Sequence, residues 1–318
     1  MRSQNVRRRG AAIQSHPIVF RSYGRAFLYN SERFSQPMFL HLKQMLVLDE
    51  LLRHAEQVWL KAALKWRPSE PTDEEMDKAD REANSGSQFD TKGLKAGMWH
   101  AWKRGDCDRL CMECVDAAGS VMARVVAFVP KGVAPPWEFW GKVFQWFGPS
   151  TSGPWYICWF GADSKRCFPA AGELGAEHVN GGYTTTCSNH GIYIYRKEEA
   201  TRVLIHEMMH AACLDEPGWS IPDREAMVET WAELILIALK ARGVPKEGHR
   251  LWKRQALWIA DSNARATKHG VHDDTDYAWR YLVGRTQMYA RLGIAIPVAT
   301  SDHPSKSTRF TDPALDPV

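Results

Sequence analysis

Residues 200–212 read ATRVLIHEMMHAA, and this stretch decides how the neighbouring sequence is interpreted. The residues that flank its polar centre are Val, Leu, Ile, Met and Ala, which predicts a largely buried helix. His206 and His210 are four positions apart, so both imidazoles lie on one helix face and can reach one metal ion. Glu207 is placed to accept a proton from a water held by such an ion. The alternative is a buried helix whose histidines are satisfied by hydrogen bonds.

A second helix follows and offers a third metal ligand. Ser220 is a typical N-cap and Gly243 a typical C-terminal residue, so we expect this helix at about residues 221–242. It carries a single stripe of acids at positions i, i+4 and i+8, namely Glu225, Glu229 and Glu233. Hydrolytic zinc sites use three protein ligands and leave one position for water. We expect Glu225 to lie on the solvated part of the stripe, which leaves the other two for the site.

The two helices resemble the gluzincin metallopeptidases. In the aminopeptidase branch of that family, HExxH is followed by 18 residues and a ligand glutamate, and 18 residues separate His210 from Glu229. Residues 228–233, VETWAE, match the family's ExxxD/E pattern, in which the second acid orients a ligand histidine. The resemblance implies one Zn²⁺ ion bound by His206, His210 and Glu229, with Glu233 as the orienting acid. It covers about 50 residues, from 190 to 240.

The same resemblance implies an enzyme, a zinc metallopeptidase that hydrolyses a peptide or protein substrate with Glu207 as general base. The GxMEN motif that grips a substrate amino terminus is absent, so aminopeptidase activity does not carry over. The segments WYICWFG, NGGYTTTC and ETWAE are also similar to zincin-like peptidases of algae and large DNA viruses. Neither resemblance fixes the substrate or distinguishes endo- from exopeptidase activity. A catalytically silent zincin-fold binding protein with structural zinc is the alternative function.

Another residue competes for the role of third ligand. Glu216 stands where metzincins place theirs, but Cys213 replaces the glycine that allows the sharp turn in that family. The sequence therefore favours Glu229.

Two further parts of the site are expected from the resemblance. In zincins the strand edge before the active helix binds an extended peptide. Gly191, Ile192 and Tyr193 are well placed for this role, and so is the stretch 181–183. A donor outside the metal ligands usually stabilises the oxyanion. The candidates lie on or near a helix predicted at about 274–292, and an ordinary core position is equally compatible with each tyrosine: Tyr277, Tyr281, Arg285 and His272.

The order of elements predicts an α+β fold. Strands are expected at 122–129, 154–161, 181–187 and 191–196, and helices at 136–147, 198–214, 221–242, 246–262 and 274–292. Strands followed by helices favour α+β over alternating βαβ units. Together with the resemblance, this predicts a zincin-like fold in which a small mixed sheet packs on the HExxH helix and a helical part follows.

Four segments are expected along the chain. Residues 1–36 form a basic segment, and residues 37–95 form a helix (37–66), ended by Pro68 and Pro71. A polar, acidic stretch follows (67–94), which is either a linker or a solvated helix. Residues 96–298 form the metallopeptidase domain, and residues 299–318 have little apolar content and are expected to be disordered.

Composition excludes several classes of protein. The chain has 318 residues, 44% hydrophobic and 25% charged, which argues against a mainly disordered protein. No apolar run approaches the roughly 18 residues that span a membrane. The net charge of +4 does not by itself indicate nucleic-acid binding. Residues 1–31 contain no acid and several arginines, which fits a solvated basic tail, an organellar transit peptide or a nucleic-acid arm. The sequence does not predict the oligomeric state.

The cysteines indicate a reducing compartment. There are seven, an odd number in a chain that is not small, and no secretory signal opens the sequence. We therefore expect thiols rather than a disulfide scaffold, and an intracellular, cytoplasmic location. Cys107, Cys111 and Cys114 have the CxxxCxxC spacing of radical-SAM cluster ligands, but no βα repeat follows. A structural zinc site or plain thiols are the other interpretations of these three residues.

Overall fold

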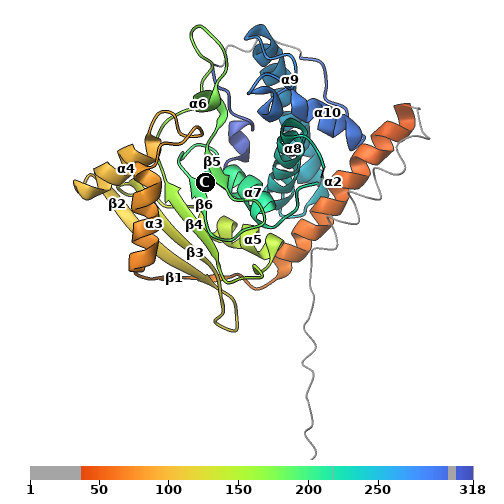
Figure 1. Cartoon of the computed structure of the whole chain (residues 1–318). Helices are drawn as coiled ribbons and strands as arrows, with labels where there is room; N and C mark the ends of the chain where they lie inside the picture. Colours follow the sequence, from red (N-terminus) through yellow and green to blue (C-terminus); the bar gives the residue numbers. More distant parts are fainter. Residues whose placement is uncertain (1–36, 217, 300–305, 318) are drawn as a thin grey trace, which may run out of the picture.

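The computed structural model describes residues 37–216, 218–299 and 306–317, with side chains from residue 46 onward. Its centre is a mixed six-stranded sheet in the order β1-β2-β3-β4-β6-β5 (Figure 1). β3, β4 and β6 are parallel neighbours, and the other neighbouring strands are antiparallel. The predicted α+β class is confirmed, as is a mixed sheet. The strands are β1 (Lys65–Pro68), β2 (Cys107–Val115), β3 (Val121–Pro130), β4 (Trp155–Phe160), β5 (Gly182–Thr184) and β6 (Ile192–Ile194).

Helices cover both faces of the sheet. On one face lie α3 (Asp73–Asn84) and α4 (Leu94–Lys103), and on the other lie α2 (Pro37–Leu60), α5 (Trp137–Phe147), α7 (Ala200–Ala211) and α8 (Ile221–Lys240) (Figure 1). The remaining helices are α6 (Ala176–Val179), α9 (Pro245–Lys268), η2 (Trp279–Tyr281), α10 (Gly284–Arg291) and η3 (Pro313–Leu315).

The central strands are apolar on both faces because each face is covered. All six residues of β4, WYICWF, are buried. In β3, Val126 and Phe128 point to the α3–α4 side, and Val125 and Ala127 point to the α7 side. Successive side chains of a strand point to opposite faces of the sheet, so a buried strand contributes side chains to two cores. The larger core lies between the sheet and α7, α8 and α2, and it holds the HExxH helix in place.

The polar segment expected to be a linker or a solvated helix contains the helix α3 and is part of the fold. β1 pairs with β2, with Lys65 opposite Val115. Thr72 and Glu75 form a capping box at the start of α3, so the acidic run after Pro71 is a helix N-terminus. Glu75 also pairs with Arg124 of β3 through two oxygens, which ties α3 to the sheet. The boundary expected near residue 95 has no counterpart in the structure.

The C-terminal segment predicted as disordered is also packed where the structure describes it. Phe310 is buried, and Thr308 and Thr311 are fully buried. The Thr311 backbone N–H and hydroxyl both donate to Glu199, at 2.8 and 2.5 Å. Phe310 N–H donates to the same carboxylate at 3.2 Å. Burial of a few anchor residues and one shared acid is enough to fix a segment whose overall composition is polar.

The helix predicted at about 274–292 is interrupted. η2 covers Trp279–Tyr281 and α10 covers Gly284–Arg291, and residue Leu282 between them is non-helical with φ −119°. Residue 284 is a glycine because a Cβ there would lie 2.7 Å from the Trp279 ring. The close approach of the indole at this point separates the two short helices.

One expectation about cysteine is wrong, and the plain thiols expected at Cys107, Cys111 and Cys114 are confirmed. The radical-SAM and structural-zinc interpretations of the β2 cysteines fail because the strand sends Cys111 into one core and Cys114 into the other. Cys187 and Cys213, expected as thiols, form a disulfide. It joins the segment after β5 to the end of α7, next to His210. The other five cysteines are free.

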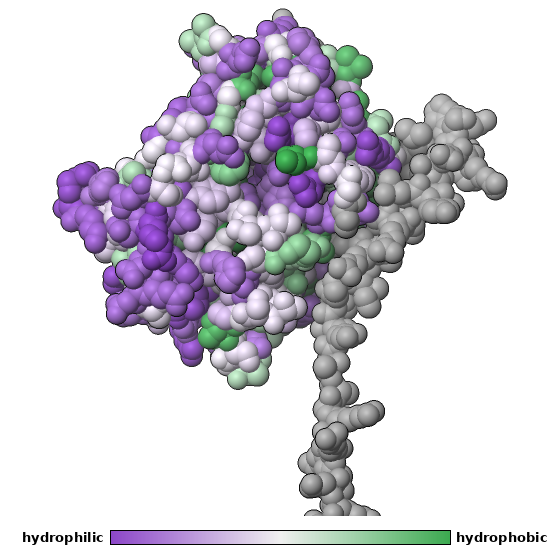
Figure 2. Space-filling model, viewed as in Figure 1, coloured by the Kyte–Doolittle hydropathy of each residue, from purple (hydrophilic) through white to green (hydrophobic). Residues whose placement is uncertain are grey.

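No helix in the described part of the chain is both long and apolar enough to cross a membrane. The face shown in Figure 2 is mostly hydrophilic, with small scattered hydrophobic areas.

Candidate functional site

The HExxH helix is buried along its whole length. Every residue of α7 is buried, and the helix packs against β5, β6 and α8. Its close approach to β5 depends on glycine, because a Cβ on Gly182 would lie 2.5 Å from Val203 and 2.8 Å from the Tyr193 carbonyl oxygen. The NGGY sequence before the helix therefore brings the strand backbone directly over the face that carries the histidines.

Three side chains converge on one point in a cavity beside α7. The Nε2 atoms of His206 and His210 are 3.0 Å apart. The Glu225 carboxylate lies 3.3 Å from the first and 3.5 Å from the second. Ligands around a tetrahedral Zn²⁺ with bonds of about 2.0–2.1 Å are about 3.3–3.4 Å apart. The three separations are close to this spacing, although the two Glu225 distances are to different carboxylate oxygens, and these residues are the metal-binding candidates in the described part of the chain.

The outer nitrogen of each imidazole faces a carboxylate. His210 Nδ1 is 2.7 Å from Asp215 Oδ1, and His206 Nδ1 is 3.1 Å from Glu229 Oε1. The second contact is an ion-pair contact and is less well aligned than a hydrogen bond. Carboxylates in these positions favour the tautomer with the proton on Nδ1, which leaves both Nε2 lone pairs free toward the same point. Two facing lone pairs beside a carboxylate need a positive charge between them.

The charges around His210 favour its protonated form. Burial opposes the charged form of His210, but contacts with Asp215 and Glu225 outweigh it and raise its pKa to about 10. Burial, together with the charge of His210, lowers the pKa of His206 to about 4. Burial favours a neutral Glu225, yet the two imidazoles outweigh it and lower the pKa of this carboxyl far below its ordinary value. A divalent cation would displace the proton and occupy the same point.

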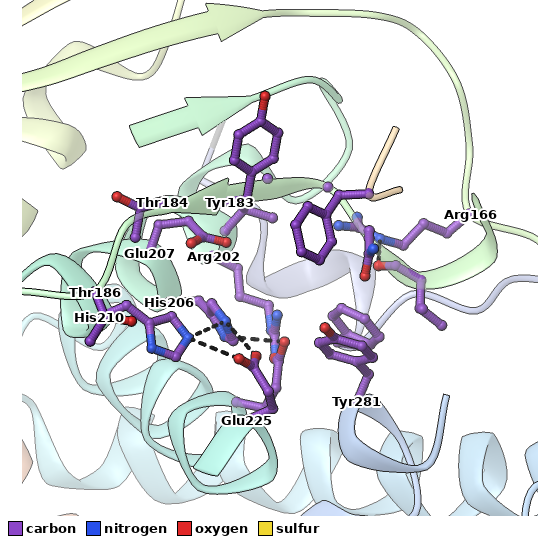
Figure 3. Close-up of a pocket in the computed structure, with 18 residues that line it drawn as sticks. Arg166, Tyr183, Thr184, Thr186, Arg202, His206, Glu207, His210, Glu225 and Tyr281 are labelled. Carbon is purple, nitrogen blue, oxygen red and sulfur yellow. Dashed lines mark hydrogen bonds and ion pairs between the residues drawn. The ribbon is translucent and has the colours of Figure 1, made fainter. Parts of the chain in front are cut away.

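Glu207 lies beside the histidines and points into the same cavity (Figure 3). Its carboxylate is near β5, 3.5 Å from the position a Cβ on Gly182 would take. Burial raises its pKa to about 8. The cavity has a volume of about 120 Å³. Its lining combines the acidic and imidazole groups with glycines, arginines and aromatic rings, including Phe89, Arg166, Gly181, Tyr183, Arg202, Tyr281 and Phe310.

The acids of α8 lie in different positions from those expected. Glu225, expected on a solvated face, is the carboxylate nearest both Nε2 atoms. Glu229, expected as the third ligand, lies instead at the outer nitrogen of His206 and pairs with Arg202. Glu233, expected to orient a ligand histidine, is engaged by Arg285, Tyr289 and Gln255. The roles are shifted by one helical turn, because Glu225 and Glu229 also form an ExxxE pair.

The sequence analysis missed two residues of the site, although the sequence position of each could have indicated it. Arg202 precedes His206 by four residues, so it shares the face of the histidines. Asp215 lies just past the end of α7, where the chain turns back toward His210. Glu216, the competing ligand, does not line the cavity.

The predicted substrate strand is not at the sheet edge. Gly191, Ile192 and Tyr193 lie at the start of β6 and just before it, and β6 is paired on both sides, to β4 and β5. In the described part of the chain β5 is the edge strand on this side of the sheet, and β1 is the edge strand on the other. The alternative stretch 181–183 overlaps β5 and lines the cavity. β6 follows β5 in the sequence and pairs with β4 in parallel, so β6, and not β5, is the inner of the two strands.

The two predicted tyrosines differ in position. Tyr281 lines the cavity, and burial raises the pKa of its hydroxyl well above the ordinary value, with Glu225 adding to the shift. The Tyr277 hydroxyl accepts a hydrogen bond from Asn180 at 2.7 Å and lies behind the lining. Arg285 forms an ion pair with Glu233. His272 is exposed and does not line the cavity.

Comparisons with known proteins add no family: no family model, curated protein or solved structure matches this chain.

Proposed function

We propose that the protein is a zinc metallopeptidase in which His206, His210 and Glu225 hold one Zn²⁺ and Glu207 is the general base. The observation that carries the proposal is the convergence of two Nε2 atoms and one carboxylate at separations of 3.0, 3.3 and 3.5 Å. Three protein ligands leave the fourth position of a tetrahedral ion for water or substrate, as in hydrolytic zinc sites. The proposal replaces Glu229 by Glu225 as the third ligand.

The outer contacts support a metal site rather than an ordinary buried ion pair. Asp215 and Glu229 each take the Nδ1 side of one histidine, which fixes the direction of both imidazoles. Metal-binding histidines are generally oriented by carboxylates in this way. Bound Zn²⁺ supplies a polarised carbonyl and a water of lowered pKa.

Each remaining part of the reaction falls to a residue of this chain. Glu207 would take the proton of the attacking water and return it to the leaving amine. The free edge of β5 lies along the cavity and would pair with the backbone of an extended peptide, which holds the scissile bond in place. Tyr281 presents a neutral hydroxyl at pH 7, because its pKa is raised, and would donate to the oxyanion.

The test is Glu207→Gln, which removes the proton acceptor and keeps the size of the side chain. Wild-type and variant protein are incubated with a mixture of unstructured peptides, and products are identified by mass spectrometry beside zinc analysis. We expect cleavage by the wild type, a loss of at least roughly 100-fold in the variant, and unchanged zinc content. Glu138→Gln, on the exposed surface, is the matched control.

Two outcomes would contradict the proposal. Equal cleavage by wild type and Glu207→Gln would show that another group is the base or that the cleavage comes from a contaminant. Zinc binding without cleavage of any peptide would favour the catalytically silent binding protein.

A further inference from the structure

A cationic group lies at one end of the cavity. Figure 3 shows Arg166 on the side away from His210 and Thr186, beyond Tyr281 and Arg202. Arg166 is fully buried and lines the cavity, although it comes from the loop between β4 and α6, far from α7 in sequence. A guanidinium has five N–H donors, and donors that are buried need acceptors.

Three of the five N–H donors of this guanidinium are used within the described residues. Nε donates to the Val179 carbonyl oxygen at 2.8 Å, and Nη1 donates to the Glu198 carbonyl oxygen and to Glu199, both at 3.1 Å. Nη2 has no hydrogen-bond partner among the described residues. Buried donors without partners are rare in folded proteins and commonly mark a ligand or a bound water.

The nearest carboxylate cannot serve Nη2, because its oxygens are already occupied. Glu199 Oε2 accepts from Arg166 Nη1 and from the Phe310 N–H, and Oε1 accepts from the N–H and hydroxyl of Thr311. The charge of Glu199 is therefore shared with the C-terminal segment.

The backbone beside the free nitrogen is shaped to leave it room. A Cβ on Gly181 would lie 2.1 Å from Nη2, a separation that no side chain at this position allows. Gly181 directly precedes the edge strand β5 and lines the same cavity. The glycine thus places an unsatisfied cationic donor beside the strand edge that would hold a substrate.

We infer that Arg166 Nη2 binds a carboxylate of the substrate, so that the cavity prefers peptides with an anionic group at this end. Two sources supply that chemistry, the C-terminal carboxylate of a peptide and an acidic side chain. The inference that the carboxylate belongs to a peptide rests on the proposed function. The binding of a carboxylate at Arg166 stands on the geometry alone.

The experiment compares peptide affinities in Zn²⁺-loaded Glu207→Gln protein, in which bound peptides stay intact, and again in metal-free protein. Calorimetry measures N-acetyl-trialanine with a free C-terminus, its C-terminal amide, and an amide whose last residue is aspartate. We expect the free carboxylate or the aspartate peptide to bind roughly 10- to 100-fold more tightly than the neutral amide, as for a charge-assisted hydrogen bond. Whichever of the two charged peptides gains affinity identifies the source.

Two variants assign the preference to Arg166. Arg166→Met removes the donor. Gly181→Ala would place a methyl group 2.1 Å from Nη2 and 3.2 Å from Cζ of Arg166, so the guanidinium must move away from its present position. Both should reduce the preference to less than about threefold, and thermal melting shows which of them is folded. Gly181→Ala keeps the test decisive if Arg166→Met fails to fold. Gly97→Ala, at an exposed position of α4 with no atom within 4 Å of its Cβ position and no positive φ, is the control for the added methyl group.

The outcomes separate this inference from the proposed function. Equal binding of all three peptides, or a carboxylate preference that persists in both variants, would overturn the role of Arg166. A preference that survives in metal-free protein and disappears in the variants would uphold it even if wild-type protein cleaves no peptide.

Discussion

At the scale of single residues, the site depends on how two imidazoles are held. His210 is fixed by Asp215 at 2.7 Å, and His206 lies 3.1 Å from Glu229. Both carboxylates act on the outer nitrogens, so they set the direction of the Nε2 lone pairs without touching the point where these converge. Partners of this kind change metal affinity although they are not ligands.

Replacing Asp215 by Asn should weaken zinc binding. The amide is a poorer acceptor for the Nδ1 proton of His210, so the imidazole becomes less basic and less firmly oriented. We expect the affinity for Zn²⁺ to fall by roughly 10- to 100-fold, measured by competition with a chromophoric chelator. Asp163→Asn, on the exposed surface, should leave the affinity unchanged. An unchanged affinity in the Asp215 variant would mean that the histidine is positioned by the helix alone.

The sequence predicts some of these residues and misses others for one physical reason. The spacing of His206 and His210 is specific, because two imidazoles one turn apart on an apolar helix have few other uses. The acids Glu225, Glu229 and Glu233 repeat every four residues, so each pair of neighbours satisfies the same ExxxE pattern. Only the packing of α8 against α7 decides which turn faces the histidines, and that packing is not encoded in the spacing.

At the scale of elements, a disulfide connects the segment after β5 to the end of the HExxH helix. Cys187 follows β5 and Cys213 follows α7, and the bond closes a loop of 26 residues that contains β6 and the HExxH helix. The Cys187 N–H also donates to the His210 carbonyl oxygen at 2.9 Å. The covalent bond therefore reinforces a backbone contact beside the site.

Removing this disulfide should destabilise the protein. Closing a loop of this length lowers the entropy of the unfolded chain, which corresponds to about 3 kcal/mol of stability. We expect Cys187→Ser with Cys213→Ser to lower the free energy of unfolding by about that amount in urea titrations. Cys167→Ser, at an exposed free cysteine, is the control. If a reductant lowers the stability of the double variant as much as that of wild type, the disulfide is not the cause.

The periodicity of apolar residues in the sequence predicts the positions of the apolar helices and strands, but it does not predict those of the polar ones. The segments 122–129, 136–147 and 154–161 are predicted within one or two residues of β3, α5 and β4, because each buries a continuous apolar set. β2 reads CDRLCMECV, and its alternation is hidden because charged residues share a face with half-buried ones. Neighbouring strands, rather than its own composition, make this segment a strand.

At the scale of the whole molecule, a buried ionic network joins the start of α7 to the C-terminal segment. Burial would raise the pKa of Glu199, but the positive charges of Arg309, Arg166 and Arg202 outweigh it and lower the pKa to about 2. The same carboxylate receives the hydrogen bonds of Thr311. Segments separated by more than a hundred residues thus share one acid, and no local pattern in either segment predicts this.

This network predicts acid sensitivity. The pKa of Glu199 is lower in the folded protein than its ordinary value of 4.5. Its contribution is therefore complete above that value and is lost as the pH falls toward 2. We expect the free energy of unfolding to fall by about 3 kcal/mol across this window through Glu199. Urea titrations at several pH values should show a flatter dependence for Glu199→Gln, which is already less stable at pH 7. An equally steep dependence would contradict the assignment.

The most direct test of the account is the zinc content of purified wild type, Glu225→Gln and Glu229→Gln, measured by elemental analysis on folded protein. Because the Glu225 carboxylate faces both Nε2 atoms, we predict one Zn²⁺ per chain in wild type and a large loss in Glu225→Gln. Glu229→Gln should retain the metal with weaker affinity. Full occupancy in Glu225→Gln, or no zinc in wild type, would contradict the proposed metal site.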